Sequence, residues 1–160
     1  MIKEIALKGI IDEDFVNYRV PSMTLMFPNC TFKCGIEYCQ NSDLVVNVKS
    51  LEIDINKLCR RYRSNPITEA IVCQGMEPFD SYDELWCLIY ELRNTYKCDD
   101  DIVIYTGYNK SEINHEVEEM MKFKNIIIKY GRYIPDQEPH YDEVLGVKLA
   151  SDNQYAERIS

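Results

Sequence analysis

Residues 70–92, AIVCQGMEPFDSYDELWCLIYEL, join a short apolar run to a turn and an amphipathic stretch, and they decide the fold class. Residues 70–73 are apolar and are followed by a turn, which indicates a buried strand. Ser81, with Glu84 three residues later, has the pattern of a capping box, so a helix is expected to begin there. One apolar helix face follows, formed by Leu85, Leu88, Ile89 and Leu92. The stretch therefore predicts a strand followed directly by a helix.

The same alternation extends along the chain in both directions. Residues 24–27, 102–105 and 126–129 are short runs rich in apolar and β-branched residues, which indicates buried strands. A helix is expected over residues 54–62, with Ile55, Leu58 and Cys59 facing inward. Asn109 and Glu112 form a second capping-box pattern, followed by the apolar residues Ile113, Val117, Met120 and Met121. Strands that alternate with helices predict right-handed crossovers and a parallel sheet.

Three loops follow three of the expected strands, over residues 28–40, 74–80 and 106–109. In open parallel sheets, ligands bind outside the carboxyl ends of the strands, on the loops that follow them. We therefore expect the three loops to meet at one edge of the sheet and to share one site.

The overall composition excludes several classes of protein. The formal net charge of −9 argues against a nucleic-acid partner, because phosphate binding needs a basic surface. The N-terminal stretch MIKEIALKGIIDEDF has no apolar run long enough for a signal peptide, and no membrane span is expected elsewhere. These features predict a cytoplasmic protein without a membrane partner, in a compartment where disulfides are rare.

The cysteines favour a metal site. The chain has seven of them, an odd number, and Cys30, Cys34 and Cys39 lie within one polar loop. Three thiolates suit an iron–sulfur cluster with one iron open, or zinc if a fourth ligand is added. That fourth ligand would be Cys59, Cys73, His115 or His140. The other isolated cysteines, Cys59, Cys87 and Cys98, are expected to pack in the core.

At this point the sequence resembles the radical S-adenosylmethionine (SAM) enzymes, and in particular the small activating enzymes of anaerobic (class III) ribonucleotide reductases. That family has a three-cysteine loop after the first barrel strand, with an aromatic residue before the third cysteine. The matching residues here are Cys30, Cys34, Tyr38 and Cys39. The second family signature, Gly-Gly-Glu/Asp-Pro, is matched by GMEP at residues 75–78.

Further stretches resemble the family in the same order along residues 15–156. They are IVIYTGYNKSEI at 102–113, GRY at 131–133 and SDNQ at 151–154. The chain departs from the family pattern at Met76, Tyr130, Ala150 and Asp152. It also has four residues rather than two between the second and third cysteines, and a loop absorbs two extra residues, near Ile36 and Glu37, at small entropic cost.

The resemblance implies a partial, open parallel β/α barrel of radical SAM type, formed by residues 1–160 as a single domain. Its cluster loop would be residues 28–41, and its SAM-binding turns would be residues 74–80 and 106–109. Cys30, Cys34 and Cys39 would bind a [4Fe-4S] cluster whose fourth iron holds SAM. Tyr38, Thr106 and Gly107 would contact SAM together with the turn residues Gly75, Met76 and Glu77.

The implied function is that of a glycyl-radical activase. Reductive cleavage of SAM would give a 5′-deoxyadenosyl radical, which abstracts hydrogen from a glycine of an anaerobic ribonucleotide reductase. No catalytic residue is expected beyond the cluster ligands. The implied partners are the glycyl-radical subunit of that reductase and a low-potential electron donor such as a flavodoxin. Two alternatives stay open: a radical SAM enzyme with another peptide or small-molecule substrate, and a non-enzymatic metal-binding protein.

Overall fold

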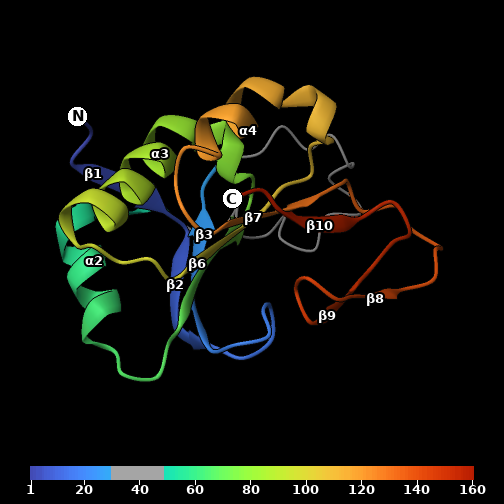
Figure 1. Cartoon of the computed structure of the whole chain (residues 1–160), viewed down its shortest axis with the longest axis horizontal. Helices are drawn as coiled ribbons and strands as arrows, with labels where there is room; N and C mark the ends of the chain where they lie inside the picture. The colour runs from blue at the N-terminus through green and yellow to red at the C-terminus, as the bar shows by residue number, and fades with distance from the viewer. Residues whose placement is uncertain (30–48) are drawn as a thin grey trace.

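The computed structural model describes residues 1–29 and 49–160. Its main sheet has six strands in the order β10-β7-β6-β5-β3-β2 (Figure 1). The four central strands are parallel to one another, and they are β3 (Ser22–Phe27), β5 (Ala70–Gly75), β6 (Asp101–Tyr105) and β7 (Ile126–Tyr130). All four contain the runs expected to be strands, so the predicted parallel sheet is confirmed.

Antiparallel strands lie at both edges of this sheet. On one side β2 (Gly9–Asp14) pairs with β3, and on the other β10 (Tyr155–Arg158) pairs with β7. Two small antiparallel pairs complete the strands of the described residues. They are β1 (Glu4–Leu7) with β4 (Leu51–Asp54), and β8 (His140–Asp142) with β9 (Val147–Leu149). The described part of the chain is a mixed α/β structure with a mostly parallel, open sheet, as expected of a partial radical SAM barrel.

The helices lie on one face of the sheet (Figure 1). They are α2 (Ile55–Ser64), α3 (Tyr82–Tyr90) and α4 (Asn114–Met120). A π-helical turn, η3 (Glu91–Thr95), continues α3, and 3₁₀ turns precede α3 (η2, Pro78–Ser81) and α4 (η4, Lys110–Glu112). The predicted helix over residues 54–62 is confirmed as α2, with Asp54 as its N-cap.

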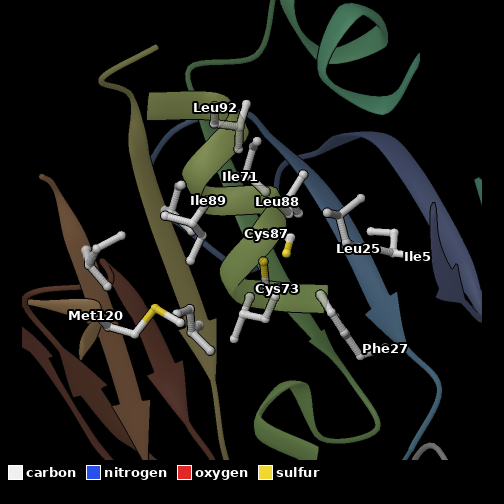
Figure 2. Packing of buried hydrophobic residues seen from close by; sticks show 14 of the residues in the cluster. Ile5, Leu25, Phe27, Ile71, Cys73, Cys87, Leu88, Ile89, Leu92 and Met120 are labelled. Carbon is white, nitrogen blue, oxygen red and sulfur yellow. The ribbon is translucent and has the colours of Figure 1, made fainter. Parts of the chain in front are cut away.

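The main core lies between this helical layer and the sheet. Figure 2 shows α3 across β5, with Leu88, Ile89 and Leu92 directed toward the strands. Cys73 of β5 and Cys87 of α3 are buried in the same layer. A second cluster covers the opposite face of the sheet, where Leu145 and Leu149, from the region of β8 and β9, pack with sheet residues. The sheet is therefore apolar on both faces, as a central parallel sheet must be.

Two details of the helix starts differ between sequence and structure. The capping box predicted at Ser81 is wrong, because the Ser81 side chain makes no capping bond and instead accepts a hydrogen bond from Asn29. The chain enters α3 through the 3₁₀ turn η2, which changes the backbone geometry at Ser81. The box at Asn109 and Glu112 is confirmed, although it caps η4 rather than α4.

Within the described ranges, no helix is long and apolar enough to cross a bilayer.

The apolar residues expected after Asn109 are mostly internal, with Ile113, Val117 and Met120 buried. Met121 is the exception, because 52% of its surface is exposed at the end of α4.

A core substitution tests the packing of α3 on the sheet. Leu88 is 1% exposed, so Leu88→Ala should lower the free energy of unfolding by about 3 kcal/mol through lost contacts and a residual cavity. The matched control is Leu51→Ala in β4, where the leucine is 48% exposed and the expected change is below about 1 kcal/mol. Chemical denaturation measures both, and equal losses would contradict this description of the core.

Candidate functional site

The carboxyl ends of β3, β5, β6 and β7 form one edge of the sheet, which we call the rim. The turn after β5 is bound there to the chain leaving β3. The backbone N–H of Met76 donates to the carbonyl of Phe27 at 2.9 Å, and that of Glu77 donates to the carbonyl of Asn29 at 2.6 Å. The Asn29 side chain also donates to the Ser81 hydroxyl at 3.0 Å. The described start of the loop over residues 28–40 therefore meets the loop over residues 74–80 at the rim.

Gly75 lets the two strands approach this closely. It adopts a positive φ of +94°, which is strained for any residue with a side chain. A Cβ atom at this position would lie 2.5 Å from the Cα of Met26 and 2.8 Å from the amide nitrogen of Phe27. The glycine at the start of the GMEP turn is thus required by the neighbouring strand. Met76, which follows it, is buried, although the family pattern has a glycine here.

Glu77 joins the turn after β5 to the turn after β6. Its Oε2 accepts a hydrogen bond from the backbone N–H of Gly107 at 2.8 Å, and its Oε1 accepts one from the N–H of Phe79 at 3.1 Å. The carboxyl group also accepts a hydrogen bond from the Thr106 hydroxyl. Burial raises the pKa of Glu77 to about 7, against the opposing effect of these hydrogen bonds. A nearly enclosed carboxyl group thus connects two loops at the rim.

The turn after β6 carries a second connection to the same loop. The Tyr108 hydroxyl donates to Oδ1 of Asp80 at 2.6 Å, and the Tyr108 N–H donates to the Thr106 hydroxyl oxygen at 3.0 Å. The five predicted SAM-contact residues in the described part of the chain, Gly75, Met76, Glu77, Thr106 and Gly107, therefore lie together at the rim. The Gly107 N–H and the Thr106 hydroxyl are both bonded to the carboxyl group of Glu77.

The SDNQ stretch near the C-terminus is also part of this edge. Gln154 donates from its side chain to the carbonyl of Gly131, and the Asn153 side chain donates to the carbonyl of Arg132 at 2.8 Å. The Ser151 hydroxyl oxygen accepts a bond from the backbone N–H of Ile134. These bonds hold the chain that leaves β7, where Gly131 has a φ of +104°. The sequence marks these residues only as part of a family motif, and their backbone partners explain why the motif has amide and hydroxyl side chains.

The remaining predicted site residues, Cys30, Cys34, Tyr38 and Cys39, lie outside the described residues. The described cysteines do not offer an alternative cluster site. All four are free and buried, namely Cys59, Cys73, Cys87 and Cys98. Burial raises the pKa of the Cys59 and Cys73 thiols to about 12, which disfavours the thiolate form that binds metal.

Nor does a zinc site assemble within the described ranges, where no three His, Cys, Asp or Glu side chains come together to hold a metal ion. None of the four described cysteines is therefore placed to serve in such a site. Three cysteine thiolates fit the donor set of an iron–sulfur cluster, and Cys30, Cys34 and Cys39 stay the predicted ligands.

The close approach at Gly75 gives a direct test of the rim. Gly75→Ala should separate β3 from β5 and lower the free energy of unfolding by about 3 kcal/mol, because a positive φ and a backbone clash coincide there. Gly9→Ala is the matched control, since its Cβ would meet only the flexible end of Met26 at 3.4 Å. Thermal or chemical denaturation compares the two, and a stable Gly75→Ala protein would contradict the described geometry.

The raised pKa of Glu77 predicts a dependence of stability on pH. The folded protein keeps this proton at pH values where the unfolded chain, with a carboxyl pKa near 4.5, has lost it. The group's contribution is therefore complete below pH 4.5 and is lost as the pH rises through about 7. Between about pH 5.5 and about pH 8, wild-type stability should fall by about 2 kcal/mol relative to Glu77→Gln.

Denaturant unfolding of both proteins across this range measures the difference. Glu52→Gln, an exposed glutamate of β4, supplies the control. If the gap between wild type and Glu77→Gln stays constant with pH, the Glu77 carboxyl does not titrate as described.

The comparisons with known proteins agree with this site. Residues 18–154 match the family described as "4Fe-4S single cluster domain", which is typical of radical SAM activating enzymes. The match spans the rim, the cysteine loop and the whole SDNQ stretch. Among curated proteins, none matches the chain. The chain therefore belongs to the 4Fe-4S single cluster domain family, and it is a radical SAM protein whose cofactors are a [4Fe-4S] cluster and SAM.

Proposed function

We propose that the protein is a glycyl-radical activase whose substrate is a glycine of an anaerobic ribonucleotide reductase. The observation that carries the proposal is the convergence at the rim of the motifs that resemble this activase family. The GMEP turn is hydrogen-bonded to Asn29 at the start of the cysteine loop and, through Glu77, to Gly107 of the TGY turn, residues 106–108. Motifs distant in the sequence are thus brought to one edge of the sheet, where ligands of parallel sheets bind.

Each residue set would have a separate task in this activity. Cys30, Cys34 and Cys39 would hold the cluster as thiolates. The backbone carbonyls of the GMEP turn would accept hydrogen bonds from the ammonium group of SAM, which has donors and no acceptor. Because the Glu77 carboxyl is already bonded to Gly107 and Phe79, its task would be to fix the position of that turn. Thr106 and Gly107 would support Glu77, and Tyr38 would pack near the adenine.

When bound, the cluster supplies the electron that splits SAM into methionine and a 5′-deoxyadenosyl radical. The protein's own contribution is to orient the cofactors and to restrict access of water. The sheet of the described residues ends in β2 on one side and β10 on the other, so it does not close around a small molecule. An open sheet suits a macromolecular substrate whose own loop completes the site.

Two protein partners follow from this proposal. One is the glycyl-radical subunit of the reductase, which offers the glycine. The other is a low-potential electron donor such as a flavodoxin, because the cluster must be reduced before each cleavage of SAM. Because the chain has a net charge of −9, each partner would need a contact surface whose charge complements an acidic protein.

The experiment is anaerobic reconstitution with iron and sulfide, followed by reduction and addition of SAM with and without a candidate reductase. The wild-type protein should form 5′-deoxyadenosine and, with the reductase, a glycyl-radical signal in electron paramagnetic resonance. Cys30→Ala, Cys34→Ala and Cys39→Ala should each lose at least about 99% of SAM cleavage, because an incomplete ligand set does not hold the cluster. Cys59→Ala is the control, since Cys59 is buried in the core and does not belong to the three-cysteine loop.

Three outcomes would contradict different parts of the proposal: the substrate, the radical chemistry or the cluster ligands. SAM cleavage without any glycyl radical, together with turnover of another peptide or small molecule, would contradict the reductase as substrate. A protein that binds zinc and no sulfide would contradict radical chemistry altogether. A Cys34→Ala variant that cleaves SAM at the wild-type rate would contradict the ligand assignment.

A further inference from the structure

A groove of about 440 Å³ lies between the C-terminal part of α3 with its π-helical turn and the segment that follows α4. Three of its lining residues are aromatic, namely Trp86, Tyr90 and Phe123. The Trp86 ring stacks on Tyr90 with centroids 5.1 Å apart and meets Phe123 edge-on at 5.6 Å. These rings are only partly buried, so the groove exposes an aromatic surface. Aromatic side chains of this kind are enriched at the centres of protein interfaces.

The groove lies at the end of the sheet opposite to the rim. Lys97 and Asp99 line it just before β6 begins, and Phe123 and Lys124 line it just before β7 begins. Because β6 and β7 are parallel, their starting ends share one edge and their carboxyl ends share the other. A ligand in the groove would therefore leave the SAM-binding edge accessible.

The groove is positively charged in an acidic protein. Its lining includes three exposed lysines, Lys97, Lys122 and Lys124, against the two anionic residues Asp99 and Glu119, whereas the chain as a whole has a net charge of −9. The side chains of Lys122 and Lys124 are 67% and 75% exposed. Their ion pairs with Glu119 and Asp99 are at the surface, where such pairs are weak and can exchange for other carboxylates. The local charge is thus complementary to an acidic partner.

The backbone around the groove is unusual in two places. The helix changes to a π-helical turn at Glu91–Thr95. Such turns are rare in proteins as a whole, and those that occur often lie at functional sites. Within this turn, Arg93 is held by hydrogen bonds to the carbonyls of Cys98, Asp100 and Lys124. Lys97 adopts a φ of +50°, a left-handed conformation that costs a lysine free energy and costs glycine none. A cationic side chain is therefore placed at the groove despite an unfavourable backbone.

We propose that this groove binds an acidic segment of a partner protein, with an apolar side chain on the aromatic surface and carboxylates on the surrounding lysines. A second copy of the chain is disfavoured because two chains of net charge −9 repel one another over their whole surfaces, whereas an acidic segment brings its carboxylates to the groove alone. The docking site is separate from the rim and does not depend on which substrate the rim serves.

The test uses the whole chain with its cluster, under anaerobic conditions. The probe is a dye-labelled synthetic peptide of leucine flanked by glutamates, and its counterpart has lysine at every glutamate position. Fluorescence anisotropy should show saturable, salt-sensitive binding of the acidic peptide only. The emission of Trp86 should change with the same midpoint, and since the chain has one tryptophan this locates the peptide at the groove.

Charge reversal provides the matched comparison. A variant with Lys97→Glu, Lys122→Glu and Lys124→Glu should bind the acidic peptide at least about tenfold more weakly, because three weak attractions become repulsions. The control variant carries Lys3→Glu, Lys57→Glu and Lys148→Glu, which change the net charge equally at exposed positions outside the groove lining. It should stay within about twofold of wild type, since distant exposed charges are screened by salt.

Lys97→Gly separates binding from stability. Glycine removes the left-handed strain, so the thermal midpoint should stay the same or rise, while affinity for the acidic peptide falls about threefold. A purely structural Lys97 would not give this combination.

Three results would overturn the proposal. They are equal binding of the two peptides, equal losses in the groove and control variants, and an unchanged Trp86 emission at saturation. Tighter binding of duplex DNA than of the acidic peptide, lost in the groove variant, would assign the site to a nucleic acid instead.

Discussion

The buried carboxyl group of Glu77 connects the loop after β5 to the loop after β6, and the arrangement of the rim depends on it. Enclosing a carboxyl group costs free energy unless its oxygens accept hydrogen bonds. Here the backbone of Gly107 and Phe79 and the hydroxyl of Thr106 provide them. Since the same turn is bound through its backbone to Phe27 and Asn29, it cannot shift without breaking contacts to two neighbouring strands. Its backbone carbonyls are thus positioned before any ligand binds, which is the arrangement that a binding site on rigid elements requires.

The central part of the fold follows from local sequence patterns. The runs at residues 24–27, 70–73, 102–105 and 126–129 are apolar and short, and each lies in a strand buried on both faces of the sheet. The strands that were not anticipated are short or polar. β2 has the sequence GIIDED, β10 has YAER, and β8 and β9 have three residues each. Such strands are specified by their neighbours rather than by their own composition.

Only part of the candidate site, like only part of the fold, could be predicted from the sequence. Parallel strands place the loops after them at one edge, so the meeting of the GMEP and TGY turns could be predicted from strand order alone. The bond between Glu77 and Gly107 could not, because it depends on the separation of two strands in space. Ser81 shows the limit of motif reading, since its hydroxyl accepts from Asn29 and the expected cap is not formed. The SDNQ side chains were likewise recognised only as a motif, because their partners are backbone groups of Gly131 and Arg132 that carry no sequence signal.

The two edge strands of the main sheet have a consequence for self-association. An exposed edge presents unpaired backbone groups that can recruit a strand from another molecule. Here β2 carries the exposed residues Asp12 and Glu13, and β10 carries Glu157 and Arg158. Charged side chains on edge strands oppose pairing with a second copy, and mutual repulsion between acidic chains adds to this effect. The charged edges of the described sheet therefore disfavour aggregation through strand pairing even at high protein concentration.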